Sequence, residues 1–167
     1  ADAERGLCVS ATIWRIATDA PDYSAADLSG EGARRTGGRW NGMGLPAIYA
    51  SESRALSALE TLVHLKAGGL PLNRYLVRIE IPDPIWASAE HWTLSGLAVG
   101  WDAEPAGLTS IAAGSDWLRS KRTCLLRLPS VIVPEEENIL LNPAHPDIDR
   151  ITATKTRRWL YDPRLRA

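Results

Sequence analysis

The chain has 167 residues and a formal net charge of −1, with 19 lysines and arginines against 20 aspartates and glutamates. This length fits a single domain over residues 1–167, and 45% hydrophobic with 23% charged residues is typical of a folded protein rather than a disordered one. The balanced charge argues against a protein whose main task is to bind nucleic acid or a membrane surface. No apolar run approaches the ~20 residues that span a bilayer, and residues 1–6 lack the order of a signal peptide, so we expect a cytoplasmic protein.

Residues that often form disulfides or metal sites are few and scattered. Cys8 and Cys124 lie far apart, so we expect both to be reduced and buried. Only three histidines occur, which argues against a metal site: His64, His91 and His145. The basic residues near the C-terminus are expected to form a solvated face: Lys155, Arg157, Arg158, Arg164 and Arg166. The aromatic residues are skewed, with seven tryptophans and no phenylalanine.

The first half of the chain alternates short elements with one long glycine-rich segment. Residues 9–16 read as a first strand, and the glycines of 23–44 predict a long ordered loop or two short hairpins. A short strand is expected at 47–50. Residues 55–65 carry apolar side chains on one side, which predicts a helix capped by Ser51 or Ser53 and ended by Gly68-Gly69.

The second half is dominated by predicted strands. Residues 74–81 alternate between apolar and polar side chains, as a half-buried strand does. Residues 82–114 look irregular with a short helical turn, and 116–121 suggest another turn. Four further short strands are expected, at 123–128, 131–133, 139–141 and 151–156. Many strands with few helices predict an α+β protein with a mainly antiparallel sheet.

Glu60 is the strongest candidate for chemistry on physical grounds. It lies about 100° around the predicted helix from Leu59, at the margin of the apolar stripe, where a carboxylate is neither fully solvated nor deep in the core. His64 follows one turn later, so an ordinary surface glutamate contacting His64 is the alternative.

A second candidate lies in Gly37-Gly38-Arg39-Trp40-Asn41. Glycines permit close approach of the backbone to a ligand, and an arginine held among them offers a planar fork suited to phosphate. The alternative for Arg39 is a loop arginine that bridges to an acidic surface residue.

Four stretches of the chain together resemble the RES domain family, which is named for an arginine, a glutamate and a serine. The matching residues are Arg39, Glu60 and Ser130, the last within Leu-Pro-Ser-Val at 128–131. The resemblance runs from about Trp14 to Leu165, and residues 86–117 match no pattern in it. The stretches that carry it are residues 32–41, 46–50, 55–65 and 142–147.

The resemblance implies a fold similar to the ADP-ribosyltransferase toxins and the toxin role in a bacterial toxin–antitoxin pair. It further implies that the enzyme depletes NAD+ by cleaving the nicotinamide–ribose bond, with phosphate or water as acceptor. Its partner would be an Xre-type helix-turn-helix antitoxin, with a homodimer possible within the complex. NAD+ is then a substrate, and neither a cofactor nor a metal is implied.

Cleavage of NAD+ suits these residues. Nicotinamide leaves as a neutral molecule from a cationic pyridinium, so one carboxylate, Glu60, suffices to stabilise an oxocarbenium-like ribose or orient the nucleophile. Arg39, with Arg15 as a second candidate, would bind the diphosphate. Tyr49 would stack on the nicotinamide ring, and Ser130 would hydrogen-bond the substrate or orient Glu60. A core tyrosine and a strand-end serine are the alternatives for these last two.

Two other functions stay open: transfer of ADP-ribose to a macromolecule, and a non-catalytic module that binds a nucleotide or a partner protein.

The tryptophans fall into groups according to the position expected for them. Trp14 and Trp159 are expected in the core, and Trp40, together with Asn41, beside the ligand. Four more are expected to cover the pocket or form an exposed apolar patch for the antitoxin: Trp86, Trp92, Trp101 and Trp117.

Overall fold

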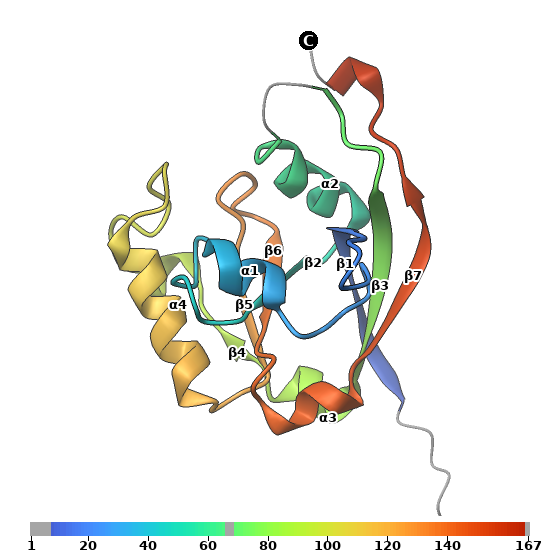
Figure 1. Cartoon of the computed structure of the whole chain (residues 1–167). Helices are drawn as coiled ribbons and strands as arrows, with labels where there is room; N and C mark the ends of the chain where they lie inside the picture. The colour runs from blue at the N-terminus through green and yellow to red at the C-terminus, as the bar shows by residue number, and fades with distance from the viewer. Residues whose placement is uncertain (1–7, 66–68, 166–167) are drawn as a thin grey trace, which may run out of the picture.

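The computed structural model describes residues 8–65 and 69–165. One seven-stranded sheet runs through them in the order β4-β5-β6-β2-β1-β3-β7 (Figure 1). Neighbouring strands are antiparallel except for the parallel pair β4 and β5. The strands are β1 (Val9–Thr18), β2 (Ile48–Ser51), β3 (Arg74–Pro82), β4 (Glu90–His91), β5 (Leu125–Pro129), β6 (Glu137–Leu141) and β7 (Thr152–Trp159).

Four α-helices accompany the sheet among the described residues, with α4 along one side of the molecule and α2 at the top of the view (Figure 1). This arrangement confirms the predicted α+β class with a mainly antiparallel sheet. No described helix combines the length and the apolar character needed to cross a membrane. The helices are α1 (Glu31–Thr36), α2 (Arg54–Leu62), α3 (Asp83–Ala87) and α4 (Leu108–Ser120), with 3-10 turns η1 (Leu94–Gly96), η2 (Pro146–Arg150) and η3 (Pro163–Leu165).

The sheet buries apolar side chains on both faces, because successive residues of a strand point to opposite sides. On one face, Ile13, Val77 and Ile139 belong to the largest core cluster, together with Ile85 of α3. On the other face, Leu126 and Leu140 pack with Trp117 and Leu118 of α4, and Trp14 and Leu76 form a smaller cluster that Ala58 of α2 contacts. The two faces therefore offer separate surfaces on which a site can be built.

Helix α2 begins as the sequence predicts and ends earlier. The Ser53 side chain caps it by accepting a hydrogen bond from the Leu56 backbone N–H, which satisfies one of the unpaired donors of the first turn. The helix ends at Leu62 rather than residue 65, and Val63 is exposed. Gly68 of the expected stop signal lies outside the described residues.

Helix α4 is the largest element that the sequence did not reveal; only a short turn was expected at 116–121. Its buried face is built mostly from small residues, so the helix lacks a strong apolar period. No side chain fits at Gly114, because a Cβ there would lie only 2.0 Å from the Trp40 carbonyl oxygen. The buried residues are Ser110, Gly114, Ser115, Trp117 and Leu118.

Two other expectations for secondary structure were wrong. Residues 131–133 form bends rather than a strand, because the Ile132 and Val133 backbone N–H groups donate to the Ser130 hydroxyl instead of to a neighbouring strand. The segment 23–44 contains the short helix α1 rather than only loop or hairpins.

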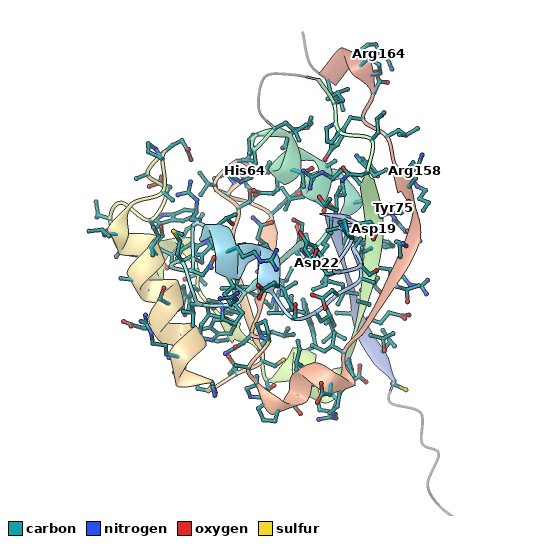
Figure 2. The ribbon with its side chains drawn as sticks, in the orientation of Figure 1. Asp19, Asp22, His64, Tyr75, Arg158 and Arg164 are labelled. Carbon is teal, nitrogen blue, oxygen red and sulfur yellow. The ribbon has the colours of Figure 1, made fainter. Side chains whose placement is uncertain are left out.

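The cysteines and the basic residues follow the expectations in part. Cys124 is buried, and burial raises the pKa of its thiol to about 12. Cys8 is exposed, which corrects the expectation of two buried cysteines. The expected solvated basic face is confirmed for the described residues, of which Figure 2 labels Arg158 and Arg164, and Arg166 lies outside them. The exposed basic residues are Lys155, Arg157, Arg158 and Arg164.

The tryptophans of residues 86–117 turn inward instead of forming an exposed patch. Trp117 is fully buried, and Trp92 and Trp101 pack against Trp40 with ring centroids 5.7 and 6.2 Å away. They therefore cover Trp40, whereas Trp86 packs against the core on the other face. Trp14 is buried as expected and Trp159 is partly buried beside it. The exposed apolar side chains of this segment are aliphatic: Leu94, Val99 and Leu108.

Candidate active site

Glu60 lies on α2 with its carboxylate turned toward the sheet. Its Oε1 accepts one hydrogen bond from the Ser130 hydroxyl at 2.7 Å and another from Asn138 Nδ2 at 2.6 Å. Among the described residues, Oε2 accepts none. The predicted alternative, a glutamate that contacts His64, is not what the structure shows, because His64 is exposed at the C-terminal end of α2 (Figure 2). One oxygen of Glu60 is thus fixed, and the other keeps its capacity to interact with a ligand.

Ser130 can act toward Glu60 only as a donor. A hydroxyl has one proton and two lone pairs, and the Ser130 oxygen already accepts from the Ile132 and Val133 backbone N–H groups, both at 3.1 Å. Its proton therefore goes to Glu60, and its side chain is fully buried. This geometry supports the orienting role predicted for Ser130 and leaves no room for a direct contact with substrate in this conformation.

Arg39 lies in the glycine-rich loop and is bound to the segment that precedes α4. Its Nη1 donates to the carbonyl oxygens of Trp101 and Ala103, at 3.1 and 2.8 Å, and its Nη2 contacts Glu104 Oε2 at 2.8 Å. The Arg39 side chain is 18% exposed and that of Glu104 is 78% exposed. The structure thus shows the predicted alternative, an arginine bridged to an acidic surface residue, at a guanidinium that solvent still reaches.

Trp40 and Asn41, which were expected beside the ligand, are buried and contact other parts of the protein in this conformation. They are 3% and 1% exposed. Asn41 Nδ2 donates to the carbonyl oxygens of Ala33 and Leu45, both at 2.9 Å, so its amide holds the loop closed. Trp40 packs beneath Trp92 and Trp101.

Tyr49 connects this loop to the sheet. Its hydroxyl donates to Asn41 Oδ1 at 2.6 Å and accepts from the Trp40 backbone N–H at 3.0 Å. Burial raises the pKa of Tyr49 above its ordinary value, more than the nearby positive charge of Arg39 lowers it, so the phenol stays a donor. Gly38 is required beside it, because a Cβ there would lie 2.7 Å from the Tyr49 hydroxyl oxygen.

The register of the sheet brings Tyr49 to the face that carries the Glu60 contacts. Tyr49 pairs with Leu140 and Ser51 pairs with Asn138, so Tyr49, Ser51 and Asn138 all point to one side. Arg39 lies close enough to influence the ionisation of Tyr49. Four predicted residues therefore gather along one face of the sheet: Arg39, Tyr49, Glu60 and Ser130.

Arg15 does not join them. Trp14 pairs with Ser51 and so points to the Glu60 side, whereas the next residue of β1, Arg15, points to the opposite face. Burial lowers the pKa of the Arg15 guanidinium, while the charge of Asp27 opposes this effect. The structure thus separates Arg15 from the other candidates.

Three residues of this arrangement were not proposed as site residues from the sequence: Ser51, which was considered only as a helix cap, Glu104 and Asn138. A polar residue in a strand is one available signal, since asparagine is depleted in strands. Asn138 stands directly before the three apolar residues that end β6, and Glu104 stands in the segment that matched no pattern. The described residues include no group of three or more histidine, cysteine, aspartate or glutamate side chains placed to hold a metal ion.

Comparison with known proteins identifies a family and several sequence relatives. The profile of the family described as "RES domain" matches residues 12–162. A protein of Sphingobium sp. (strain YBL2), named "Prs ADP-ribosylating toxin", is 63% identical over 94% of this chain and 98% of its own length. Proteins named "Toxin Res" from Yersinia enterocolitica and Pseudomonas putida are 35% and 38% identical, covering 86% and 80% of this chain and 93% and 86% of their own lengths.

A solved structure shares the fold. It is the crystal structure of the M. tuberculosis MbcT–MbcA toxin–antitoxin complex, with a TM-score of 0.61 and 19% identity over 87% of this chain and 84% of that one. The sequence relatives are named as toxins, and the solved structure shows that this chain has the same fold as a toxin from such a complex. The chain belongs to the RES domain family.

Proposed function

We propose that this protein cleaves the nicotinamide–ribose bond of NAD+ and transfers the ADP-ribose group to an acceptor. The observation that carries the proposal is the Glu60 carboxylate, which two donors hold by Oε1 while Oε2 has no partner among the described residues. An anion fixed in this way is preorganised to stabilise positive charge that develops on a substrate.

The reaction balances with one carboxylate. The bond between ribose C1′ and the nicotinamide nitrogen breaks, and its electron pair stays on nitrogen, which neutralises the pyridinium. Positive charge passes to the ribose, where Glu60 stabilises it. The acceptor then forms a bond to C1′ and releases its proton to Glu60 or to water. Because the leaving group is neutral, no general acid is required.

The substrate's diphosphate requires a cation, and Arg39 is the candidate on the same face as Glu60. A diphosphate would compete with Glu104 for the guanidinium and offers more negative charge in a bidentate geometry. Tyr49, fixed by two hydrogen bonds, would orient the nicotinamide end. Arg15, on the other face, has a place in this proposal only if that face opens to the substrate.

We favour a protein acceptor over a small one. The relative from Sphingobium, which is 63% identical, carries a name that states ADP-ribosylation of Prs. At this identity over 94% of the chain, Prs is the first acceptor to test. Phosphate or water, the acceptors that the family resemblance implies, is the second candidate, and both reactions share the step in which nicotinamide leaves.

The acceptor can be tested with NAD+ labelled in its adenine ring, incubated with the purified chain, and with or without Prs and phosphate. Transfer to protein predicts label that migrates with Prs. Label that appears only in a small product which requires phosphate would support phosphorolysis instead. Binding of NAD+ without nicotinamide release in any mixture would favour the non-catalytic module.

An antitoxin partner forms part of the same proposal. The solved structure that shares this fold is a complex of a toxin with its antitoxin. We expect a helix-turn-helix antitoxin to bind this chain, cover its active site and suppress nicotinamide release. Co-expression with the product of a neighbouring gene, followed by size-exclusion chromatography, tests for the complex and for the predicted homodimer within it.

Removal of the Glu104 charge is expected to strengthen substrate binding. Glu104 is mostly exposed, so its ion pair with Arg39 is worth at most about 1 kcal/mol, which corresponds to roughly a fivefold change in affinity. Glu104→Gln should therefore lower the KM for NAD+ by about two- to fivefold with kcat unchanged. Asp116→Asn, which removes an exposed carboxylate on the far part of α4, serves as the control. A KM that rises in Glu104→Gln would contradict competition between Glu104 and the substrate.

A further inference from the structure

The hydrogen bonds behind Glu60 extend one layer further than the predicted site. Asn138 of β6 donates from Nδ2 to Glu60 Oε1 at 2.6 Å, and its Oδ1 accepts from the Ser51 hydroxyl at 2.7 Å. Ser51 is the residue that pairs with Asn138 across the two strands. A continuous row of hydrogen bonds thus runs from Ser51 through Asn138 to the carboxylate.

This row fixes the orientation of the Asn138 amide. If the amide were flipped, Oδ1 would face the carboxylate oxygen of Glu60 across 2.6 Å, which no proton would bridge. The Ser51 hydroxyl, 3% exposed, donates to Oδ1 and so favours the same orientation. Both contacts of Asn138 therefore present its N–H to Glu60.

The residue types are poor choices for a sheet that only needs to be stable. Asparagine is depleted in strands, and the residues that follow it in β6 are apolar and buried. A residue type that is unfavourable for the secondary structure it occupies is expected mainly at functional sites. The strand tolerates this asparagine because its Nδ2 donates to Glu60 and its Oδ1 accepts from Ser51.

We propose that Asn138, supported by Ser51, is a positioning residue for Glu60 in the proposed cleavage of NAD+, on which this inference depends. Asn138 and Ser130 together hold Oε1, which fixes the plane of the carboxylate and directs Oε2 toward the substrate. Without Asn138, the carboxylate keeps only the hydrogen bond from Ser130, and it can rotate about that contact. The effect should then fall on the chemical step rather than on substrate binding.

The test is the steady-state rate of nicotinamide release by the purified chain and its variants. Asn138→Ala removes one hydrogen bond to a charged group, so we expect kcat to fall about 10- to 100-fold while the KM for NAD+ stays within about threefold. Ser51→Ala keeps the Asn138 N–H donor but removes the hydrogen bond that fixes the orientation of its amide. We expect a smaller loss of kcat, of about three- to tenfold. Asn73→Asp, on an exposed loop, is the control for the change of charge in the next variant.

Asn138→Asp gives a readout that a purely structural role would not change. At neutral pH it sets a second carboxylate beside Glu60, and we expect a greater loss of kcat than in Asn138→Ala. As the pH falls toward about 5, a proton shared between the two carboxylates restores a donor, so activity relative to wild type should rise. Asn73→Asp should follow the wild-type pH profile.

Four results would overturn the inference. Wild-type kcat in Asn138→Ala, or a loss in Asn138→Asp that is the same at every pH, would remove the positioning role while the proposed function stands. If Asn138→Ala does not fold, as thermal unfolding will show, Ser51→Ala decides, and wild-type kcat there overturns the row of hydrogen bonds. No nicotinamide release by the wild type would overturn the proposed function and this inference with it.

Discussion

Replacing Glu60 by glutamine should reduce nicotinamide release from NAD+ by at least about a thousandfold, because the variant lacks the only charge proposed to stabilise the ribose cation. The amide is nearly isosteric with the carboxylate. Its carbonyl oxygen can still accept from Ser130 and Asn138, so the position of the side chain is retained. Rates of nicotinamide release by wild type and Glu60→Gln, measured at saturating NAD+, give the comparison.

Two controls make this result specific to Glu60. The melting temperature of Glu60→Gln should lie within a few degrees of wild type, since both hydrogen bonds to the side chain can form. Glu52→Gln changes an exposed glutamate just before α2 and should keep the wild-type rate. Substantial turnover by Glu60→Gln would contradict the role assigned to the carboxylate.

Substitution of Gly114 should have the largest effect on stability. In Gly114→Ala the new Cβ would lie 2.0 Å from the Trp40 carbonyl oxygen and 2.7 Å from its Cβ, which forces α4 away from the glycine-rich loop. Overpacking of this kind costs about 3 kcal/mol. In a chain of this size the loss lowers Tm by roughly 6–12 °C. Thermal unfolding followed by circular dichroism measures the change.

The same substitution should also reduce activity. The Gly42 backbone N–H donates to the Ser115 hydroxyl of α4, so movement of the helix displaces the loop that carries Arg39. Gly32→Ala is the matched control, because a Cβ there has no neighbour within 4 Å, and alanine is favoured over glycine in a helix by about 0.5–1 kcal/mol. A Gly114→Ala protein with the wild-type Tm would show that α4 is not packed against Trp40 as described.

The sequence predicted those elements whose apolar pattern is strong. β3 alternates along its length, and α2 has a capping serine and an apolar side, so both were found within a few residues. α4 was missed because its buried face contains the small residues Ser110, Gly114 and Ser115, and at Gly114 a close approach to Trp40 excludes any side chain. Packing against a distant segment leaves little trace in local periodicity.

The site shows the same division. Arg39, Tyr49, Glu60 and Ser130 were proposed from a family resemblance and chemical reasoning, and the fold places them on one face. Whether a residue is free to bind a ligand depends on tertiary contacts that the sequence does not show. The Asn41 amide donates to backbone carbonyl oxygens of its own loop, and Arg39 forms an ion pair with Glu104. Which face a strand residue occupies depends on register, and this placed Arg15 apart from the rest.

The most direct test of the account is the release of nicotinamide from NAD+ by the purified chain, free of antitoxin, measured beside Glu60→Gln at equal concentration. The account predicts release by the wild type, with Prs and phosphate present, that continues beyond one equivalent of enzyme, and none above background by the variant. Equal rates in the two proteins, or no release by the wild type at protein concentrations comparable to NAD+, would contradict it.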